Sequence, residues 1–88
     1  MGFRWNEWNL DHVTKHGIST VDAEYVVLNA VRPDPLKRED EKWLVWGPTP
    51  AGRLVQVVFV TDEDDSIYII HARPLTRAEM RTFRRRKR

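Results

Sequence analysis

The first apolar positions of the chain have spacings typical of a short strand and a short helix. Residues 3–5 alternate apolar, polar and apolar side chains, which predicts an opening strand. Residues 9–15 predict a brief helix that stops at Gly17, because glycine readily adopts the left-handed conformation that closes helices.

A second helix is predicted to follow directly. Ser19 and Asp22 have the spacing of an N-terminal capping box, with Asp in the usual position of Glu. Val21, Tyr25 and Leu28 then fall at i, i+4 and i+7, so they form one apolar face of a helix that ends near residue 30.

The middle of the chain has the pattern of an antiparallel sheet. Residues 32–41 contain prolines and alternating charges and predict an exposed loop. Residues 42–46, 53–61 and 66–72 then predict three strands joined by short turns, an arrangement that favours a meander. The second of these is rich in Val on both faces, which indicates a central strand covered on two sides.

The last helix has the clearest start signal in the chain. Thr76 and Glu79 form a capping box, and Met80 and Phe83 are spaced to make a buried stripe. The predicted order is therefore β-α-α-β-β-β-α, an α+β fold in which helices surround a small antiparallel sheet.

Composition limits the class of protein. The 88 residues suffice for a single domain, predicted to span 1–88. No apolar run reaches the roughly 20 residues that cross a bilayer, and the N-terminus lacks the apolar region of a signal peptide. With no cysteine, we expect neither disulfides nor a thiolate metal site, and a cytoplasmic location with no membrane partner.

Charge is distributed unevenly along the chain. Residues 66–88 hold eight of the fifteen Lys and Arg but one acid, Glu79, a formal charge of +7; residues 1–65 carry seven bases and twelve acids, a formal −5. A one-sided basic face attracts polyanions, most often nucleic acid. The predicted RNA contacts on the last helix are Arg81, Arg84 and Arg85, and residues 84–88 are expected to form a frayed basic tail.

If the polyanion is RNA, its cleavage without a metal would require a base for the 2′-hydroxyl, an acid for the leaving 5′-oxygen and cations for the phosphate. Histidine suits the proton roles and arginine suits the phosphate. The chain offers such groups in three separated segments, and the predicted catalytic residues are His16, Lys15, Arg53, Arg73 and Arg77.

The histidines have other interpretations. His12 and His16 lie four apart and share a helix face, but Asp11 lies off that face, so we expect no metal or other cofactor. His16 is either a C-terminal helix cap or a site residue, and His12 is expected to support or pack. His71 alternates with Ile69, which is typical of a half-buried, hydrogen-bonded histidine.

The arginines and tryptophans also have alternatives. Arg73 lies between a strand and a proline, and its other reading is an ion pair with an acid such as Asp22 or Glu24. Arg77 begins a helix, where a cation is unfavourable unless a phosphate binds there. Trp8 is either a base-stacking residue or part of the core and its rim.

Three stretches of this sequence form a recognisable set. They are Trp5-Asn6-Glu7-Trp8-Asn9 leading to Lys15-His16-Gly17-Ile18, the Gly52-Arg53 start of a valine-rich strand, and His71-Ala72-Arg73-Pro74-Leu75-Thr76-Arg77-Ala78-Glu79. In this order they resemble the BrnT family of toxins from bacterial type II toxin–antitoxin systems, over about residues 3–83. The chain departs from that family at His71, where Ser or Thr is usual.

The resemblance implies a RelE-like fold, metal-independent endoribonuclease activity that inhibits translation, and neutralisation by an antitoxin encoded beside the toxin. Antitoxins of this family commonly carry a ribbon-helix-helix module, so DNA would be contacted only through the antitoxin. Two rival functions stay open: a non-catalytic RNA- or antitoxin-binding module of the same fold, and a structural protein whose basic helix binds an acidic partner.

Overall fold

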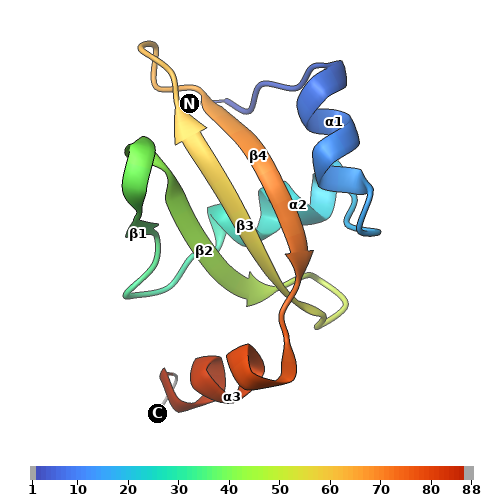
Figure 1. Cartoon of the computed structure of the whole chain (residues 1–88), viewed down its shortest axis with the longest axis vertical. Coiled ribbons are helices and arrows are strands. Elements are labelled where there is room, and N and C mark those ends of the chain that lie inside the picture. The colour runs from blue at the N-terminus through green and yellow to red at the C-terminus, as the bar shows by residue number, and fades with distance from the viewer. Residues whose placement is uncertain (1, 87–88) are drawn as a thin grey trace.

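The computed structural model describes residues 2–86 and has the expected α+β architecture (Figure 1). Four antiparallel strands form one sheet in the order β1-β2-β3-β4. In chain order the elements are α1 (Glu7–Thr14), α2 (Thr20–Leu28), β1 (Leu36–Lys37), a 3₁₀ turn (Glu39–Glu41), β2 (Trp43–Pro48), β3 (Leu54–Thr61), β4 (Ile67–Pro74) and α3 (Arg77–Arg86).

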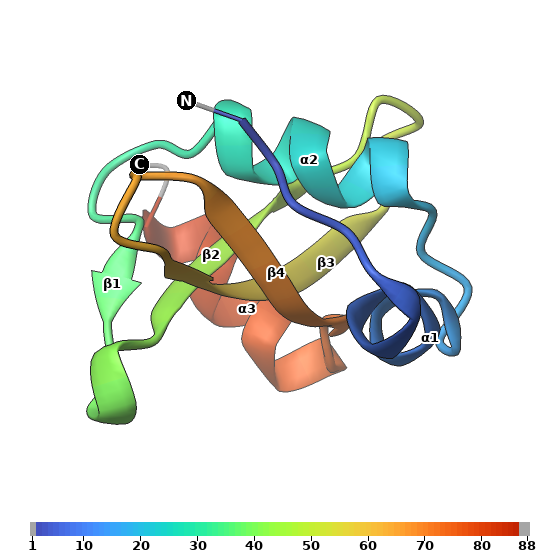
Figure 2. The same cartoon turned by 90° about the horizontal axis from the view of Figure 1, so that it is seen from above.

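The helices lie on different sides of the sheet. Seen from above, α2 lies on one face and α3 on the other, while α1 runs beside β4 (Figure 2). The hydrophobic core fills the space between the sheet and α1 and α2, and includes Val13, Ile18, Val26, Val55 and Ile69. We call the α2 side of the sheet the inner face and the α3 side the outer face.

Asn9 anchors α1 to the sheet. Its side chain completes a reciprocal cap, because Asn9 Oδ1 accepts from the Asn6 N–H at 2.7 Å and Asn6 Oδ1 accepts from the Asn9 N–H at 3.2 Å. Asn9 is fully buried, and its Nδ2 donates to the carbonyl oxygens of Arg4 and Ile69. The helix therefore begins two residues before the predicted start, and it ends as predicted near Gly17, whose φ is +79°.

The start of α2 is confirmed, but its predicted apolar face does not pack on the sheet. Ser19 caps the helix by accepting from the Asp22 N–H at 3.1 Å. The buried residues are Ala23 and Val26, whereas Val21, Tyr25 and Leu28 are exposed. The helix is apolar on two sides, and the smaller side chains of Ala23 and Val26 allow it to lie close to the strands.

The predicted meander of three strands is confirmed, with differences at its margin. The predicted opening strand is a single parallel bridge between Phe3 and Ile67. The region expected to be a loop, residues 32–41, contains β1 and a buried carboxylate, that of Asp34. Asp34 Oδ2 accepts from the Trp46 N–H at 2.7 Å, so it satisfies a donor on β2 beyond the end of β1.

A bulge in β4 determines which side chains reach the outer face. Phe59 pairs with Ile69 and Val58 pairs with His71, so Ile70 is an extra residue on β4. Beyond the bulge, Ala72 is buried on the inner face and His71 lies on the outer face. Strict alternation with Ile69 would have placed His71 on the inner face.

The capping box of α3 is confirmed. The Thr76 N–H donates to Glu79 Oε1 at 2.8 Å, and the Glu79 N–H donates to Thr76 Oγ1 at 3.1 Å. At its other end Arg86 pairs with the buried Asp34 at 2.5 Å. Residues 84–86, expected to begin a frayed tail, are helical; Lys87 and Arg88 lie outside the described residues.

No helix in the described part of the chain is both long enough and apolar enough to cross a membrane.

Candidate functional site

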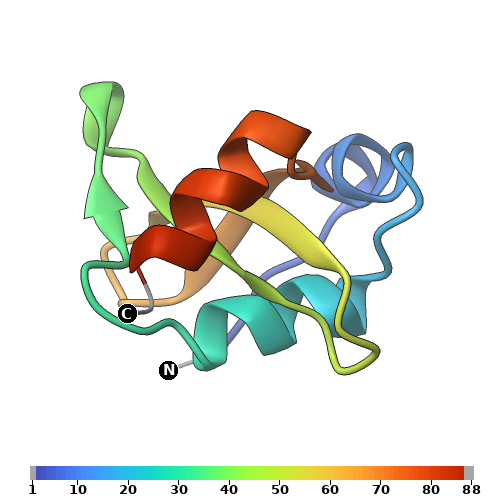
Figure 3. The same ribbon diagram turned by 90° about the horizontal axis from the view of Figure 1, so that it is seen from below.

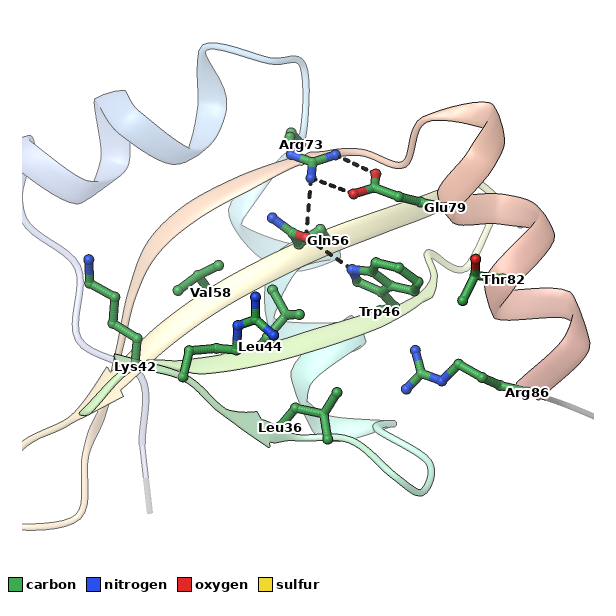
Figure 4. Close-up of a pocket in the computed structure, with 11 residues that line it drawn as sticks. Leu36, Lys42, Leu44, Trp46, Gln56, Val58, Arg73, Glu79, Thr82 and Arg86 are labelled. Carbon is green, nitrogen blue, oxygen red and sulfur yellow. Dashed lines mark hydrogen bonds and ion pairs between the residues drawn. The ribbon is translucent and has the colours of Figure 1, made fainter. Parts of the chain in front are cut away.

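A groove runs between the outer face of the sheet and α3 (Figure 4). Its volume is about 580 Å³, and its walls are mostly basic, aromatic and aliphatic. The lining residues are Leu36, Arg38, Lys42, Leu44, Trp46, Gln56, Val58, Arg73, Glu79, Thr82 and Arg86.

Cross-strand pairing explains why residues from different strands line the groove together, because paired residues share a face of the sheet. Trp46 pairs with Gln56 and Gln56 with Arg73, which makes one row across three strands. Val58 pairs with His71, which extends the neighbouring row to the edge beside α1. Arg73 and His71 are thus two residues apart on the same face.

Arg73 is held firmly in place at the edge of the groove (Figure 4). Its Nη1 and Nη2 donate to the two carboxylate oxygens of Glu79 at 2.7 and 2.8 Å. Nη1 also donates to the Pro74 carbonyl oxygen at 3.0 Å, and Nη2 to Gln56 Oε1 at 3.3 Å. Both Nη nitrogens are therefore engaged twice, which leaves the Nε–H for other partners.

The Arg73–Glu79 pair alters both ionisations. Hydrogen bonding from Arg73, with help from the backbone N–H of Thr76, lowers the pKa of Glu79 to about 2. The same pair raises the pKa of Arg73. The ion-pair reading of Arg73 is thus realised with Glu79, and the acids suggested from sequence lie elsewhere; Glu24, for example, accepts from Trp5 Nε1 at 2.7 Å.

Two imidazoles meet where α1 ends beside β4. The ring centroids of His16 and His71 are 5.9 Å apart in an edge-on arrangement. His71 is half-buried, and its pKa is lowered, first by burial and then by the charges of Arg73, His16 and Lys15. His71 is therefore neutral at neutral pH and can accept a proton, while His16 is exposed.

The other predicted catalytic residues lie at the end of α1, just before β3 and at the start of α3. Lys15 is close enough for its charge to act on His71. Arg53 Nη1 donates to the Gly17 carbonyl oxygen at 3.2 Å, which ties the start of β3 to the end of α1. Arg77 is exposed at the first residue of α3.

The predicted RNA contacts lie on two surfaces. Arg81, Arg84 and Arg85 are exposed on α3. Trp8 is 51% exposed on α1, with its ring stacked on His12 at 3.9 Å between centroids. His12 Nδ1 lies 2.7 Å from the Trp8 carbonyl oxygen, and these contacts confirm that His12 packs on its own helix.

Among residues 2–86, no group of three His, Asp or Glu side chains has an arrangement that could hold a metal ion.

Sequence reasoning missed several residues of the groove. Lys42 and Arg38 belong to a region read as a loop and its border, and Gln56 looked like an ordinary strand position, whereas Trp46 was considered for base stacking. Pairing of aromatic and polar residues across neighbouring strands could have indicated their shared face. Alternation with Ile69 predicts the wrong face for His71, and nothing in the local sequence shows the bulge at Ile70 that places its side chain on the outer face.

Comparison with known families identifies the chain. Residues 5–79 match the family described as the ribonuclease toxin BrnT of type II toxin–antitoxin systems. The chain belongs to the BrnT family. Membership gives it a ribonuclease activity, with RNA as substrate and an antitoxin protein as partner. Neither a curated protein nor a solved structure matches the chain.

Proposed function

We propose that this BrnT-family protein is a metal-independent endoribonuclease that cuts RNA at the outer face of the sheet and so inhibits translation in the cytoplasm. The observation that carries this proposal is the contact between the exposed His16 and the half-buried, neutral His71 beside a fixed arginine. Transesterification of RNA requires one group that accepts a proton and one that donates a proton, and two adjacent imidazoles can fill these two roles.

The reaction can be written with groups of this chain alone. His71 takes the proton of a ribose 2′-hydroxyl, and the 2′-oxygen attacks the adjacent phosphorus. The P–O5′ bond breaks as His16, in its protonated form, gives a proton to the leaving 5′-oxygen. The products are a 2′,3′-cyclic phosphate and a 5′-hydroxyl, so no oxidant, metal or further reactant is consumed.

Several cations are assigned to stabilise the negative charge on the phosphate. Lys15 and Arg53 lie nearest to the end of α1 and are assigned to the phosphate oxygens as negative charge develops. Arg77, which is exposed at the first residue of α3, is assigned to an adjacent phosphate. Because both its Nη nitrogens are engaged, Arg73 acts chiefly as a positioning residue, and its charge adds to burial in lowering the pKa of His71.

The groove offers a path for single-stranded RNA on one side of this centre. Arg38 and Lys42 supply cations for the backbone, and Trp46 supplies an aromatic surface for a base. Trp8 and the exposed arginines of α3, at positions 81, 84 and 85, extend the contact surface. The fold is proposed to be RelE-like, and the antitoxin to be of the ribbon-helix-helix type, through which the pair contacts DNA.

The test is RNA cleavage by purified, antitoxin-free protein in EDTA. Wild-type protein is expected to cut RNA, and His71→Gln and His16→Gln are each expected to slow cleavage by about 100-fold or more, the usual contribution of a general acid or base. His12→Gln is the matched control, because His12 lies on the same helix and packs on Trp8. Full activity of both site variants would refute the assignment.

The engaged state of Arg73 favours one alternative, a non-catalytic RNA- or antitoxin-binding module. In that case the purified protein would retain RNA in a binding assay but leave it intact under all conditions. A purely structural protein would do neither.

A further inference from the structure

An apolar surface covers the solvent side of α2, away from the imidazole pair. Val21 and Leu28 are each 68% exposed, Val31 is 55% exposed and Tyr25 39%. Four of the six large apolar side chains that are exposed in residues 2–86 belong to this set. We call it the α2 surface. Val21, Tyr25 and Leu28 have helical spacing, and Val31 follows shortly after the end of α2; exposed apolar surfaces of this kind mark protein contacts.

The α2 surface ends in two hollows. One, of about 130 Å³, lies between Tyr25, Val31 and the end of β2 at Gly47 and Pro48. The other, of about 330 Å³, is lined by Val31, Arg32, Phe83 and Arg86. Both hollows lie where the C-terminal ends of α2 and α3 approach each other beside β2 (Figure 3). Hollows beside an apolar ridge can receive the anchoring side chains of a partner.

The charge at this end of the α2 surface is positive. Arg32 is exposed directly after Val31, and Arg84 and Arg85 are exposed on the last turn of α3. Another apolar cavity, which includes Trp43 and Phe59, is bordered instead by Asp64 and Asp65. An acidic, amphipathic segment therefore matches the α2 surface and would be repelled from the other cavity.

We propose that the antitoxin protein docks on the α2 surface through an acidic amphipathic helix. Apolar side chains of that helix enter the hollows beside Val31, and its carboxylates face Arg32 and the last turn of α3. The partner is a protein rather than RNA because the ridge formed by Val21, Tyr25 and Leu28 is apolar and carries no cation for a phosphate. This inference rests on the family assignment only for the identity of the partner.

The docking position also explains how a partner could act on the groove without entering it. Trp46 lines both the groove and the smaller hollow, and Arg86 lines both the groove and the larger hollow. A helix seated on the α2 surface therefore contacts the back of two groove residues.

The test uses the full chain and the protein encoded by the adjacent gene. Val21→Glu/Leu28→Glu is expected to weaken binding at least about 100-fold, as loss of two buried anchors does at protein interfaces. Leu10→Glu is the control, because Leu10 is 44% exposed on α1, outside the α2 surface. The affinity of Leu10→Glu for the antitoxin should stay within about threefold of the wild-type value. Thermal unfolding of each variant confirms that it is folded.

A second variant tests the charged end. Arg32→Glu should weaken binding and reduce its dependence on salt, because an acidic partner loses one ionic contact. Affinities of both site variants within threefold of wild type would overturn the proposal. Antitoxin-free Val21→Glu/Leu28→Glu should cleave RNA at the wild-type rate; loss of binding in a protein whose wild type never cuts RNA would sustain the docking surface and reject the proposed nuclease.

Discussion

His71 shows how one residue acquires a chemical role from its surroundings. Burial first, and then the charges of neighbouring groups led by Arg73, disfavour its protonated form, so its pKa lies below the usual value of 6.5. The proposed base is therefore neutral over a wider pH range than an ordinary histidine would be.

This shift predicts the pH dependence of cleavage. The acidic limb of kcat/KM should lie below pH 6.5, since activity is lost only when His71 gains a proton. His71→Gln should remove this limb along with most of the activity, whereas His12→Gln should keep it. The measurement is kcat/KM between pH 5 and 9 on a short RNA. A limb that persists unchanged in the His71→Gln residual activity would assign the base to another group.

At the scale of elements, α3 is the part of the fold that depends most on charge. It is held to the sheet at its start by Arg73–Glu79 and at its end by Arg86–Asp34. Glu79 also completes the cap, so one carboxylate determines both where α3 begins and how Arg73 is oriented.

Replacing this carboxylate should destabilise the protein in a pH-dependent way. The pKa of Glu79 falls from 4.5 to about 2 on folding, so its stabilisation is fully present above pH 4.5 and is lost as the pH falls toward 2. Glu79→Gln should lower the free energy of unfolding by roughly 1–3 kcal/mol at pH 7, the usual range for a charged hydrogen bond. Urea unfolding at several pH values measures both the loss of stability and its dependence on pH.

The decisive quantity in that experiment is the difference in the free energy of unfolding between the wild type and Glu79→Gln. This difference should become smaller as the pH falls from 4.5 to 2, because wild-type Glu79 then becomes protonated. Glu63→Gln is a suitable control on an exposed turn. A difference in the free energy of unfolding that stays constant with pH would mean that Glu79 acts through packing alone.

The elements differ in how far they can be predicted from the residues. The cap of α3 depends on residues three apart, so Thr76 and Glu79 suffice to locate it. The buried side of α2 depends on which side chains fit against strands far away in the sequence, and the apolar spacing of Val21, Tyr25 and Leu28 is compatible with either core or interface. The bulge at Ile70 depends on cross-strand register, which no local pattern shows.

The same difference applies to the site. Histidine and arginine could be chosen by chemistry, and the structure brings Lys15, His16 and Arg73 to the environment of His71. Which donors are already engaged could not be read from the sequence, because the acid that engages Arg73 is six residues away on the next element.

At the scale of the whole molecule, the proposed surfaces for RNA and for the antitoxin lie mainly on opposite faces of the sheet and meet at the last turn of α3. α3 and α2 lie on opposite sides of the sheet (Figure 2). The α3 side has a groove lined in part by cations, whereas the exposed side of α2 is apolar. The chain's formal charge of +2 conceals this division. Under these two proposals, the antitoxin would hold the toxin through α2 residues that are not assigned to the chemistry.

The most direct test of this account is the chemistry of the RNA ends made by purified protein in EDTA. Attack by the neighbouring 2′-oxygen, driven by His71 and His16, predicts fragments with 2′,3′-cyclic phosphate and 5′-hydroxyl ends. These ends can be identified by mass spectrometry of a cleaved oligonucleotide. An otherwise identical substrate with a 2′-O-methyl group at the cleavage position should stay intact. Fragments with 3′-hydroxyl and 5′-phosphate ends, formed only when a divalent metal is restored, would contradict the account.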